Sequence, residues 1–296
     1  MNQYELSPDQ DLIVSGKYIN RFEDVNSRPL KNSGFLIEAQ HLLRHESFNT
    51  IFGGGAYRFS WIDRDSNGKR IKLPFRYMNR ENVYFYTNIN YPRDINLTLG
   101  LSYDSFNSTI TGDREDKINP KFVVQWNLFE NFRLRAAWFE TTKSHLVAQQ
   151  TLEPTQVAGF NQFFDDINGT RTKRMGIGLD YHMSHTLYGG VEASKRSLLV
   201  PTRLNIKEHL EKQNENLYRT YLYWTLNPYW LIKGEFQFEQ YKRSKNEPTF
   251  DEFTPTRIHT LSTPISVEYF HPVITLDDRM RYIAENIVSS NLDHRS

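Results

Sequence analysis

The chain has 296 residues and a nearly balanced charge, with 36 Lys plus Arg against 35 Asp plus Glu. This balance argues against a nucleic-acid-binding surface, for which a strong basic excess is usual. Cysteine is absent, which excludes disulfides and thiolate metal sites. No charge block or Pro/Gly-rich linker divides the chain, so we expect a single domain.

Hydropathy excludes one common kind of membrane protein. The sequence has no run of about 18 apolar residues, so no transmembrane helix is expected. The amino end, MNQYELSPDQDL, lacks a basic start and an apolar core, so we expect no signal peptide in this chain. The mean hydropathy of −0.65 resembles that of a soluble protein. That average is equally expected for barrel strands, because their polar and apolar faces cancel.

Alternation of apolar and polar residues predicts the strands in chain order. Each alternating segment is close to the ~9–11 residues that a tilted strand needs to cross a bilayer. The segments cover residues 10–18, 34–43, 50–61, 82–90, 94–105, 120–128, 132–142, 172–182, 186–197, 214–226, 229–243 and 258–270. Allowing for one more near the start, we expect about 12 to 14 antiparallel strands.

The connections between these segments alternate between short and long. Short turns such as YPR and Asn227-Pro228 alternate with long segments at 62–81, 106–119, 143–171, 198–213 and 244–257. Outer-membrane barrels have short turns at one rim and long loops at the other. The sequence therefore predicts an all-β protein whose residues 1–272 form an antiparallel transmembrane β-barrel, complete or partial.

The hairpin WTLNPYWLIKGEFQFEQY, residues 224–241, shows how the two strand faces differ. Its apolar face carries Trp230, Ile232, Phe236 and Phe238, and charged residues occupy the alternate positions. Aromatic residues also lie near strand ends, as expected for the girdles at membrane interfaces: Trp61, Tyr91, Trp126, Trp138, Trp224, Tyr229 and Trp230. We expect the apolar face to meet lipid and the charged face to line an aqueous lumen. A soluble β-sandwich, with the apolar face inside, is the alternative.

Charged residues on the predicted inner face are the first candidate site. They are Arg133, Arg135, Arg174, Asp180, Glu192, Lys233, Glu235 and Glu239. The arginines, opposite Asp180 and Glu192, could create a transverse field that selects polar solutes, as rings of charge do in pores. They could equally pair with one another across the lumen.

The long loop at 143–171 supplies the second candidate site. Its phenylalanines Phe160, Phe163 and Phe164 could fold inward, to narrow the channel or form a ligand platform. Alternatively, they pin the loop to the rim.

Other residue patterns give no catalytic, metal or cofactor site. His182 and His185 flank a predicted turn without a third ligand, so no metal is expected. Ser144 and His145 lack a recognisable nucleophile setting, so no enzyme is expected. Gly53-Gly54-Gly55 lacks the Lys-Ser/Thr of a phosphate loop, and its glycines more simply relieve crowding in a strand or mark a bulge.

The segment LVAQQTLEPTQVAGFNQFFDDINGTRTKRMGIGLDY, residues 146–181, resembles the barrel region of TonB-dependent outer-membrane receptors and related barrels behind tetratricopeptide repeats. Leu152-Glu153-Pro154 and Gly178-Leu179-Asp180 carry the resemblance. It implies a Gram-negative outer-membrane location among lipid and a role in porin-like passage or receptor-mediated uptake of a small polar solute. A plug domain and a TonB-contact segment are not visible, so energy coupling is not implied.

Two other functions stay open at this point. One is a non-transporting anchor for a periplasmic repeat domain encoded upstream, with loops that bind surface polysaccharide. The other is a soluble β-sandwich or lectin-like binding module.

The alternation stops after Tyr269-Phe270-His271-Pro272, where Met280, Ile283 and Ile287 fall at helical spacing. We expect residues 273–296 to lie outside the barrel, either as a helix or as the result of a changed reading frame near Pro272.

Overall fold

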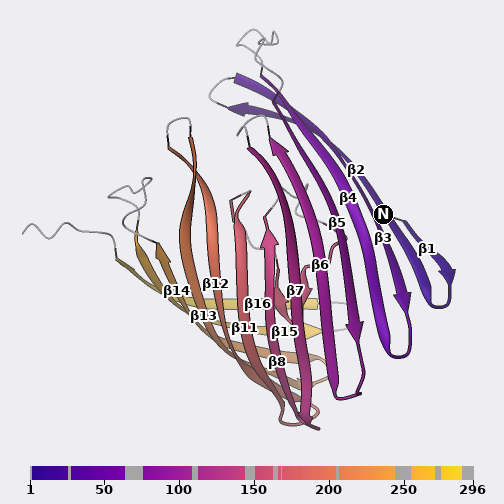
Figure 1. Ribbon diagram of the computed structural model, residues 1–296. Helices are drawn as coiled ribbons and strands as arrows, with labels where there is room; N and C mark the ends of the chain where they lie inside the picture. The colour runs from indigo at the N-terminus through magenta and orange to yellow at the C-terminus, as the bar shows by residue number, and fades with distance from the viewer. Residues whose placement is uncertain are drawn as a thin grey trace, which may run out of the picture.

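A computed structural model of the chain describes residues 2–25, 28–63, 76–108, 113–143, 151–162, 166–167, 169–204, 207–243, 255–270 and 275–288. These residues form one curved antiparallel sheet of 14 strands in the order β1 to β8 followed by β11 to β16, and a separate two-stranded hairpin, β9–β10 (Figure 1). The all-β antiparallel architecture predicted from the alternation is confirmed. No described residues form a helix long and apolar enough to cross a membrane.

The strand bounds are as follows. The first eight are β1 Asn2–Ser7, β2 Gln10–Val25, β3 Arg28–Arg44, β4 Phe48–Asp63, β5 Arg76–Ile89, β6 Ile95–Ser108, β7 Asp113–Phe129 and β8 Phe132–Thr142. The others are β9 Gln156–Val157, β10 Phe160–Asn161, β11 Arg171–His182, β12 Leu187–Leu204, β13 Lys207–Asn227, β14 Trp230–Arg243, β15 Arg257–Phe270 and β16 Thr275–Val288.

Short turns collect at one end of the sheet. The connections at 8–9, 45–47, 90–94, 130–131, 183–186 and 228–229 lie at this end, which we call the turn rim; we call the opposite end of the sheet the loop rim (Figure 1). All twelve predicted segments are strands, and β1 is the additional strand expected near the start.

Three of the predicted long loops are wrong in extent. β4 continues to Asp63 and β5 begins at Arg76, β6 continues to Ser108 and β7 begins at Asp113, and β12 continues to Leu204 and β13 begins at Lys207. At the end of β12, Leu198, Leu199 and Val200 are consecutive apolar residues, with Leu198 and Val200 buried on the inner face, so the sequence loses its alternation although the backbone ladder continues. The strands therefore extend past the segments that alternation marks.

The expected non-barrel tail is also wrong for Thr275–Val288. This segment forms β16 and pairs antiparallel with β15, with Met280 opposite Ile265 and Ile283 opposite Ser262. The spacing of four between Ile283 and Ile287 is even, so it fits one face of a strand as well as one face of a helix.

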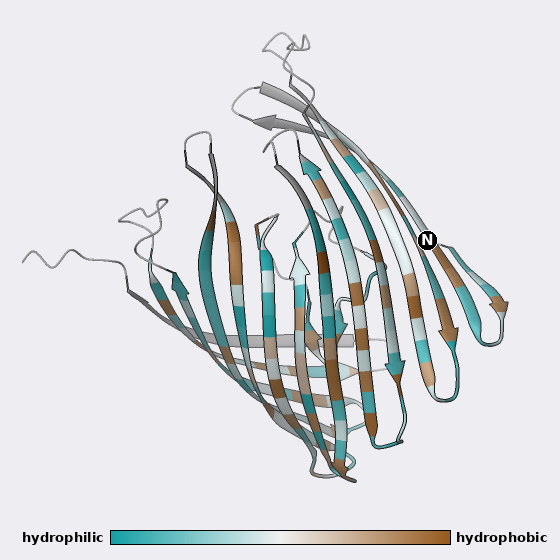
Figure 2. Ribbon diagram, viewed as in Figure 1, coloured by the Kyte–Doolittle hydropathy of each residue, from teal (hydrophilic) through white to brown (hydrophobic). Residues whose placement is uncertain are grey.

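Apolar side chains point away from the concave side of the sheet. Leu99, Ile177 and Phe236 are 37%, 53% and 50% exposed, whereas Arg135 is 7% exposed. We call the apolar side the outer face and the opposite side the inner face; the alternation is visible along the coloured parts of the strands in Figure 2. Within the described strands no ladder joins β1 to β16, so this sheet is not closed.

The glycine run of β4 makes room for large side chains on the inner face. A Cβ at Gly53 would lie 2.5 Å from the hydroxyl oxygen of Tyr84, and one at Gly55 would lie 2.8 Å from Cγ of Glu38. The prediction that these glycines relieve crowding is confirmed.

Candidate functional site on the inner wall

The inner face is polar and much of it is buried beneath residues 151–162, which cross it. Its buried polar side chains come from β3, β5 to β8 and β11 to β12 and include Glu38, Gln40, Arg80, Asn82, Ser102, Asp104, Asn119, Lys121, Arg135, Arg174, Asp180, Glu192 and Arg196. Buried polar groups are costly unless they are hydrogen-bonded or paired, so the contacts among these groups determine whether the wall is stable.

Glu153 is the main polar anchor of the covering segment. Its Oε1 accepts a 2.8 Å hydrogen bond from the hydroxyl of Tyr86, and Nζ of Lys121 and Nη2 of Arg80 lie 3.8 and 3.9 Å from its two oxygens. Burial raises the pKa of Glu153, and the charge of Lys121 opposes that rise. Arg80 is paired more closely with Asp104, at 2.7 Å, so Arg80 and Lys121 together face the carboxylates of Glu153 and Asp104.

Two further contacts extend this anchor. The hydroxyl of Thr151 donates to Glu38 at 2.7 Å, and the side-chain amide of Gln162 donates to the carbonyl of Pro154 at the same distance. Segment 151–162 is thereby tied to itself and to β3, β5 and β7, which are far apart in sequence.

Phe160 is the apolar anchor. It is fully buried, with the guanidinium carbons of Arg135 and Arg174 at 5.2 and 5.5 Å from its ring centroid. A Cβ at Gly176 would lie 2.3 Å from the ring, so only glycine leaves space for it there. The ring belongs to a cluster with Tyr84, Tyr86, Val123, Ala137, Phe139 and Val157.

The hairpin that carries Phe160 turns sharply between β9 and β10. Ala158 and Gly159 both have positive φ, 47° and 81°, as the two-residue hairpin turn of type I′ requires. Arg135 donates to the carbonyl of Ala158 at 2.8 Å, which fixes the turn against β8.

Of the three loop phenylalanines, Phe160 folds inward. It is fully buried and pins the loop to the inner wall rather than to the rim, and its role as a ligand platform stays a prediction. Phe163 and Phe164 lie outside the described residues.

Four of the predicted lumen residues come together in one chain of ion pairs. Arg135 Nε lies 2.9 Å from Asp180, Arg135 Nη2 lies 3.5 Å from Glu192, and Arg174 Nη2 lies 3.5 Å from Glu192. The hydroxyl of Tyr221 also donates to Asp180. These charges were expected either to create a transverse field or to pair with one another, and the observed distances are those of mutual pairing.

The other predicted lumen residues lie apart from this chain. Lys233 pairs with Glu268, and Glu235 accepts from Arg219 and from the hydroxyl of Tyr223, at 3.1 and 2.6 Å. Glu239 is exposed. Arg133 is also exposed, at the turn rim, where it donates to Asn127 at 3.0 Å. Arg133 thus lies outside the chain of ion pairs that contains Arg135, and its contribution to a transverse field stays a prediction.

The cluster around Glu153 was not predicted as a site. Glu153 was noted only for its place in Leu152-Glu153-Pro154, and Arg80 lies in a segment where alternation had not begun. The sequence could have indicated this cluster, because alternate residues of a strand share a face, and β5 therefore places Arg80, Asn82, Tyr84 and Tyr86 on one face. His182, at the end of β11, and His185, in the turn that follows, are exposed, and His182 packs against the ring of Tyr188.

No protein-family model matches the chain, and no curated protein matches it. Solved structures do. The FrpB iron transporter from Neisseria meningitidis superimposes with a TM-score of 0.60 at 14% identity, over 93% of this chain and 47% of FrpB. The siderophore receptor PiuA from Acinetobacter baumannii gives 0.62 at 10% identity, over 96% of this chain and 56% of PiuA.

The sheet has the fold of a TonB-dependent receptor barrel wall. The ferric-catecholate import receptor Fiu from Escherichia coli K12 gives the same result, with a TM-score of 0.60 at 8% identity over 98% of this chain and 57% of Fiu. The chain spans about half the length of the solved receptors that it matches. The fold predicted from residues 146–181 is confirmed.

Proposed function

We propose that this chain forms part of the wall of an outer-membrane β-barrel that takes up a small polar solute in a receptor-like manner. The observation that carries the proposal is the inverted sheet: exposed apolar side chains on the outer face, and buried, paired charges on the inner face. In water that arrangement would expose a large apolar surface, whereas in a bilayer it places apolar groups in lipid.

The inner wall supports passage of polar solutes. Its charges and amides offer hydrogen-bonding partners to a hydrated solute, as polar lumens do in such barrels. Segment 151–162 lies on this wall, so it would narrow the passage. The names of the matched receptors, which include iron, siderophore and copper transporters, favour small solutes of that kind over macromolecules.

Among the described strands, β1 and β16 each have one edge without a partner, which supports a larger closed assembly. Lipid cannot hydrogen-bond free backbone groups, and each unsatisfied group costs several kcal/mol, so each edge would pair with a further strand. A soluble sandwich would instead need the apolar faces to meet one another, and the anchor function has no observation in its favour.

Cell fractionation tests the proposal. The chain, expressed behind a signal peptide, should be recovered in the outer-membrane fraction and should migrate differently on a gel before and after boiling, because folded barrels resist detergent until heated. Recovery as a soluble protein without detergent would contradict the membrane location and with it the uptake function.

A further inference from the structure

Three tyrosine rings lie together on the inner face near the turn rim. They are Tyr188 of β12 and Tyr221 and Tyr223 of β13, and we call them the tyrosine platform. We infer that the tyrosine platform and the polar groups around it form a binding site for a neutral oligosaccharide. The inference rests on the proposed uptake function and deepens it, because it names the class of solute.

The register of β12 and β13 brings the three rings together. Tyr188 lies directly opposite Tyr223, and Tyr221 lies opposite Gly190. The ring centroids are 5.9 Å apart for Tyr188 and Tyr221, 6.1 Å for Tyr188 and Tyr223, and 5.5 Å for Tyr221 and Tyr223, at interplanar angles of 28° to 42°. Tyr221 is buried and packs against both other rings, so Tyr188 and Tyr223 present the accessible surface.

Hydrogen bonds to the wall hold two of these rings by their hydroxyl groups. The hydroxyl of Tyr221 donates to Asp180 on β11, and that of Tyr223 donates to Glu235 on β14 at 2.6 Å. A Cβ at Gly190 would lie 2.5 Å from the hydroxyl oxygen of Tyr221, so only glycine lets Tyr221 cross β12 to reach Asp180. Because its hydroxyl is bonded to the wall, Tyr223 presents its ring to a ligand.

The accessible rings differ from the tyrosines beneath segment 151–162. Tyr188 and Tyr223 are half-buried, whereas Tyr84 and Tyr86 are each 1% exposed. Within the described residues, no hydrogen bond or ring contact joins Tyr188 or Tyr223 to segment 151–162. A solute on the inner wall can therefore reach the platform without displacing that segment.

The polar groups around the platform carry balanced charge. Arg219 lies 3.1 Å from Glu235, which also accepts from Gln237 at 2.7 Å. From the turn rim to the row of Glu192, the described inner face of β8 and β11 to β15 carries four cations and four carboxylates. Since neighbouring opposite charges largely cancel, this surface favours an uncharged ligand over an ionic one. The eight residues are Arg133, Arg135, Arg219, Lys233, Asp180, Glu192, Glu235 and Glu268.

A neutral sugar has both properties that this surface would recognise. Its ring presents C–H groups that pack on an aromatic ring, and its hydroxyl groups donate and accept hydrogen bonds. Arg219 and Glu235 supply a donor and an acceptor beside the platform, and their side chains are 26% and 19% exposed. Because two accessible rings lie 6.1 Å apart, successive units of one oligosaccharide can contact both.

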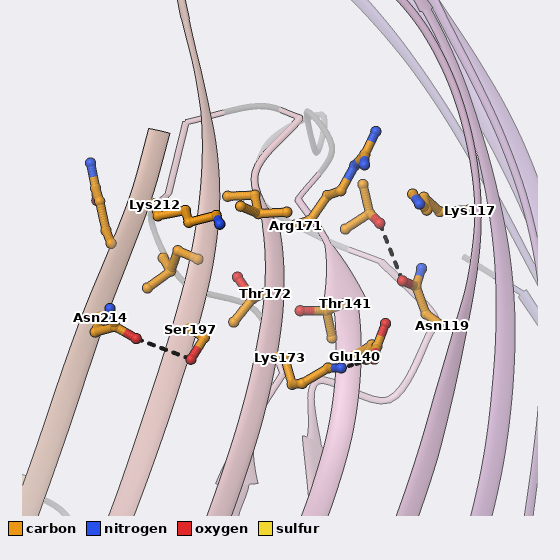
Figure 3. A pocket seen from close by; sticks show the side chains of 14 residues that line it. Lys117, Asn119, Glu140, Thr141, Arg171, Thr172, Lys173, Ser197, Lys212 and Asn214 are labelled. Atoms are coloured by element: carbon orange, nitrogen blue, oxygen red, sulfur yellow. Dashed lines mark hydrogen bonds and ion pairs between the residues drawn. The ribbon is translucent and has the colours of Figure 1, made fainter. Parts of the chain in front are cut away.

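A polar hollow at the loop rim has different chemistry (Figure 3). Its volume is about 450 Å³, and among the described residues that line it, which include Lys117, Glu140 and Thr172, there is no aromatic side chain. This hollow offers a sugar ring nothing to stack on. It does supply a control, because Ser197 and Asn214 in its lining, hydrogen-bonded at 3.2 Å, carry a hydroxyl and an amide without a ring.

The test is calorimetric titration of the full chain with cellohexaose and with maltohexaose, in micelles of lauryldimethylamine oxide, a detergent without a sugar headgroup. We expect at least one of these neutral hexamers to bind. Tyr188→Leu/Tyr223→Leu should weaken binding at least about tenfold, whereas Tyr188→Phe/Tyr223→Phe, which keeps the rings, should stay within about threefold. Tyr188→Leu alone, which keeps the bond between Tyr223 and Glu235, should weaken it about threefold or more.

Two control variants and one control ligand accompany the titration. Tyr218→Leu removes a 48% exposed ring from the outer face of the same strand, and Ser197→Ala/Asn214→Ala removes polar groups of the loop-rim hollow. Each should change binding by less than about twofold. Hexagalacturonic acid, which has the same kind of ring with a carboxylate on each unit, should bind more weakly than the neutral hexamer.

Four results would overturn the inference: no binding of either neutral hexamer, unchanged binding in the leucine variants, equal weakening in a control variant, or tighter binding of the acidic hexamer. The gel comparison before and after boiling, run on every variant, separates this test from that of the proposed function. A chain that shows the heat-dependent shift but binds neither neutral hexamer contradicts the sugar site alone. A chain that stays soluble without detergent contradicts the membrane location.

Discussion

Replacing Leu99 by Arg should lower the free energy of unfolding from a bilayer by about 2–4 kcal/mol, the cost of placing an arginine near the midplane on the lipid face of a barrel. Leu99 is the middle member of the outer-face row Ile95, Leu97, Leu99, Leu101 and Tyr103 on β6, so it lies at about the centre of the apolar belt. The measurement is the urea dependence of folding into phosphatidylcholine vesicles.

Asn107→Arg is the matched control. Asn107 lies on the same strand and face but at the loop rim, where arginine costs about 0–1 kcal/mol. In a soluble protein both substitutions would be at exposed positions and would change stability by about 0.5 kcal/mol or less. Equal, small effects at the two positions would therefore contradict the lipid-facing assignment.

Replacing Arg135 by Met should cost about 3–5 kcal/mol, because it leaves Asp180 and Glu192 buried with their shared cation removed. It also removes the donor to the Ala158 carbonyl and one cation over Phe160, so segment 151–162 should loosen. The expected results are a lower urea midpoint and faster proteolysis within 151–162.

Arg133→Met is the control for this substitution. Arg133 is two residues away on the same strand and face, but it is exposed and bonded only to Asn127 among the contacts described above. We expect a change within about 0.5 kcal/mol and unaltered proteolysis. Similar losses in the two variants would contradict the placement of Arg135 in a buried chain of ion pairs.

The strand pattern could be predicted where one face met an apolar medium. In β6 the alternation of Leu97, Leu99 and Leu101 with polar residues fixed both the strand and its outer face. It failed at the end of β12, where Leu198, Leu199 and Val200 are consecutive apolar residues, and in β16, where an even spacing of isoleucines suits helix and strand alike. Alternation in the sequence shows which strand residues contact an apolar medium. The backbone hydrogen bonds between strands continue past those residues.

The candidate site was only partly predictable for a different reason. The alternation of side chains along a strand was enough to place one group of residues on the same face of neighbouring strands: Arg135, Arg174, Asp180 and Glu192. It could not show that Glu153, more than 30 residues from Lys121 and more than 70 from Arg80, folds between them, because that contact depends on the path of a loop. Full burial of Phe160 likewise depends on the space left by Gly176. The sequence does not show that the hairpin of Phe160 packs on β11, so it could not predict this role for Gly176.

The most direct test of the central claim uses the absence of cysteine. A single cysteine at Phe236 and another at Gln237, each carrying a nitroxide, should report opposite environments in vesicles because these neighbours lie on opposite faces of β14. We predict that the label at 236 relaxes faster with oxygen, which concentrates in lipid, and the label at 237 with a water-soluble nickel chelate. The reverse pattern, or equal access of the chelate to both, would contradict the assignment of the apolar face to lipid.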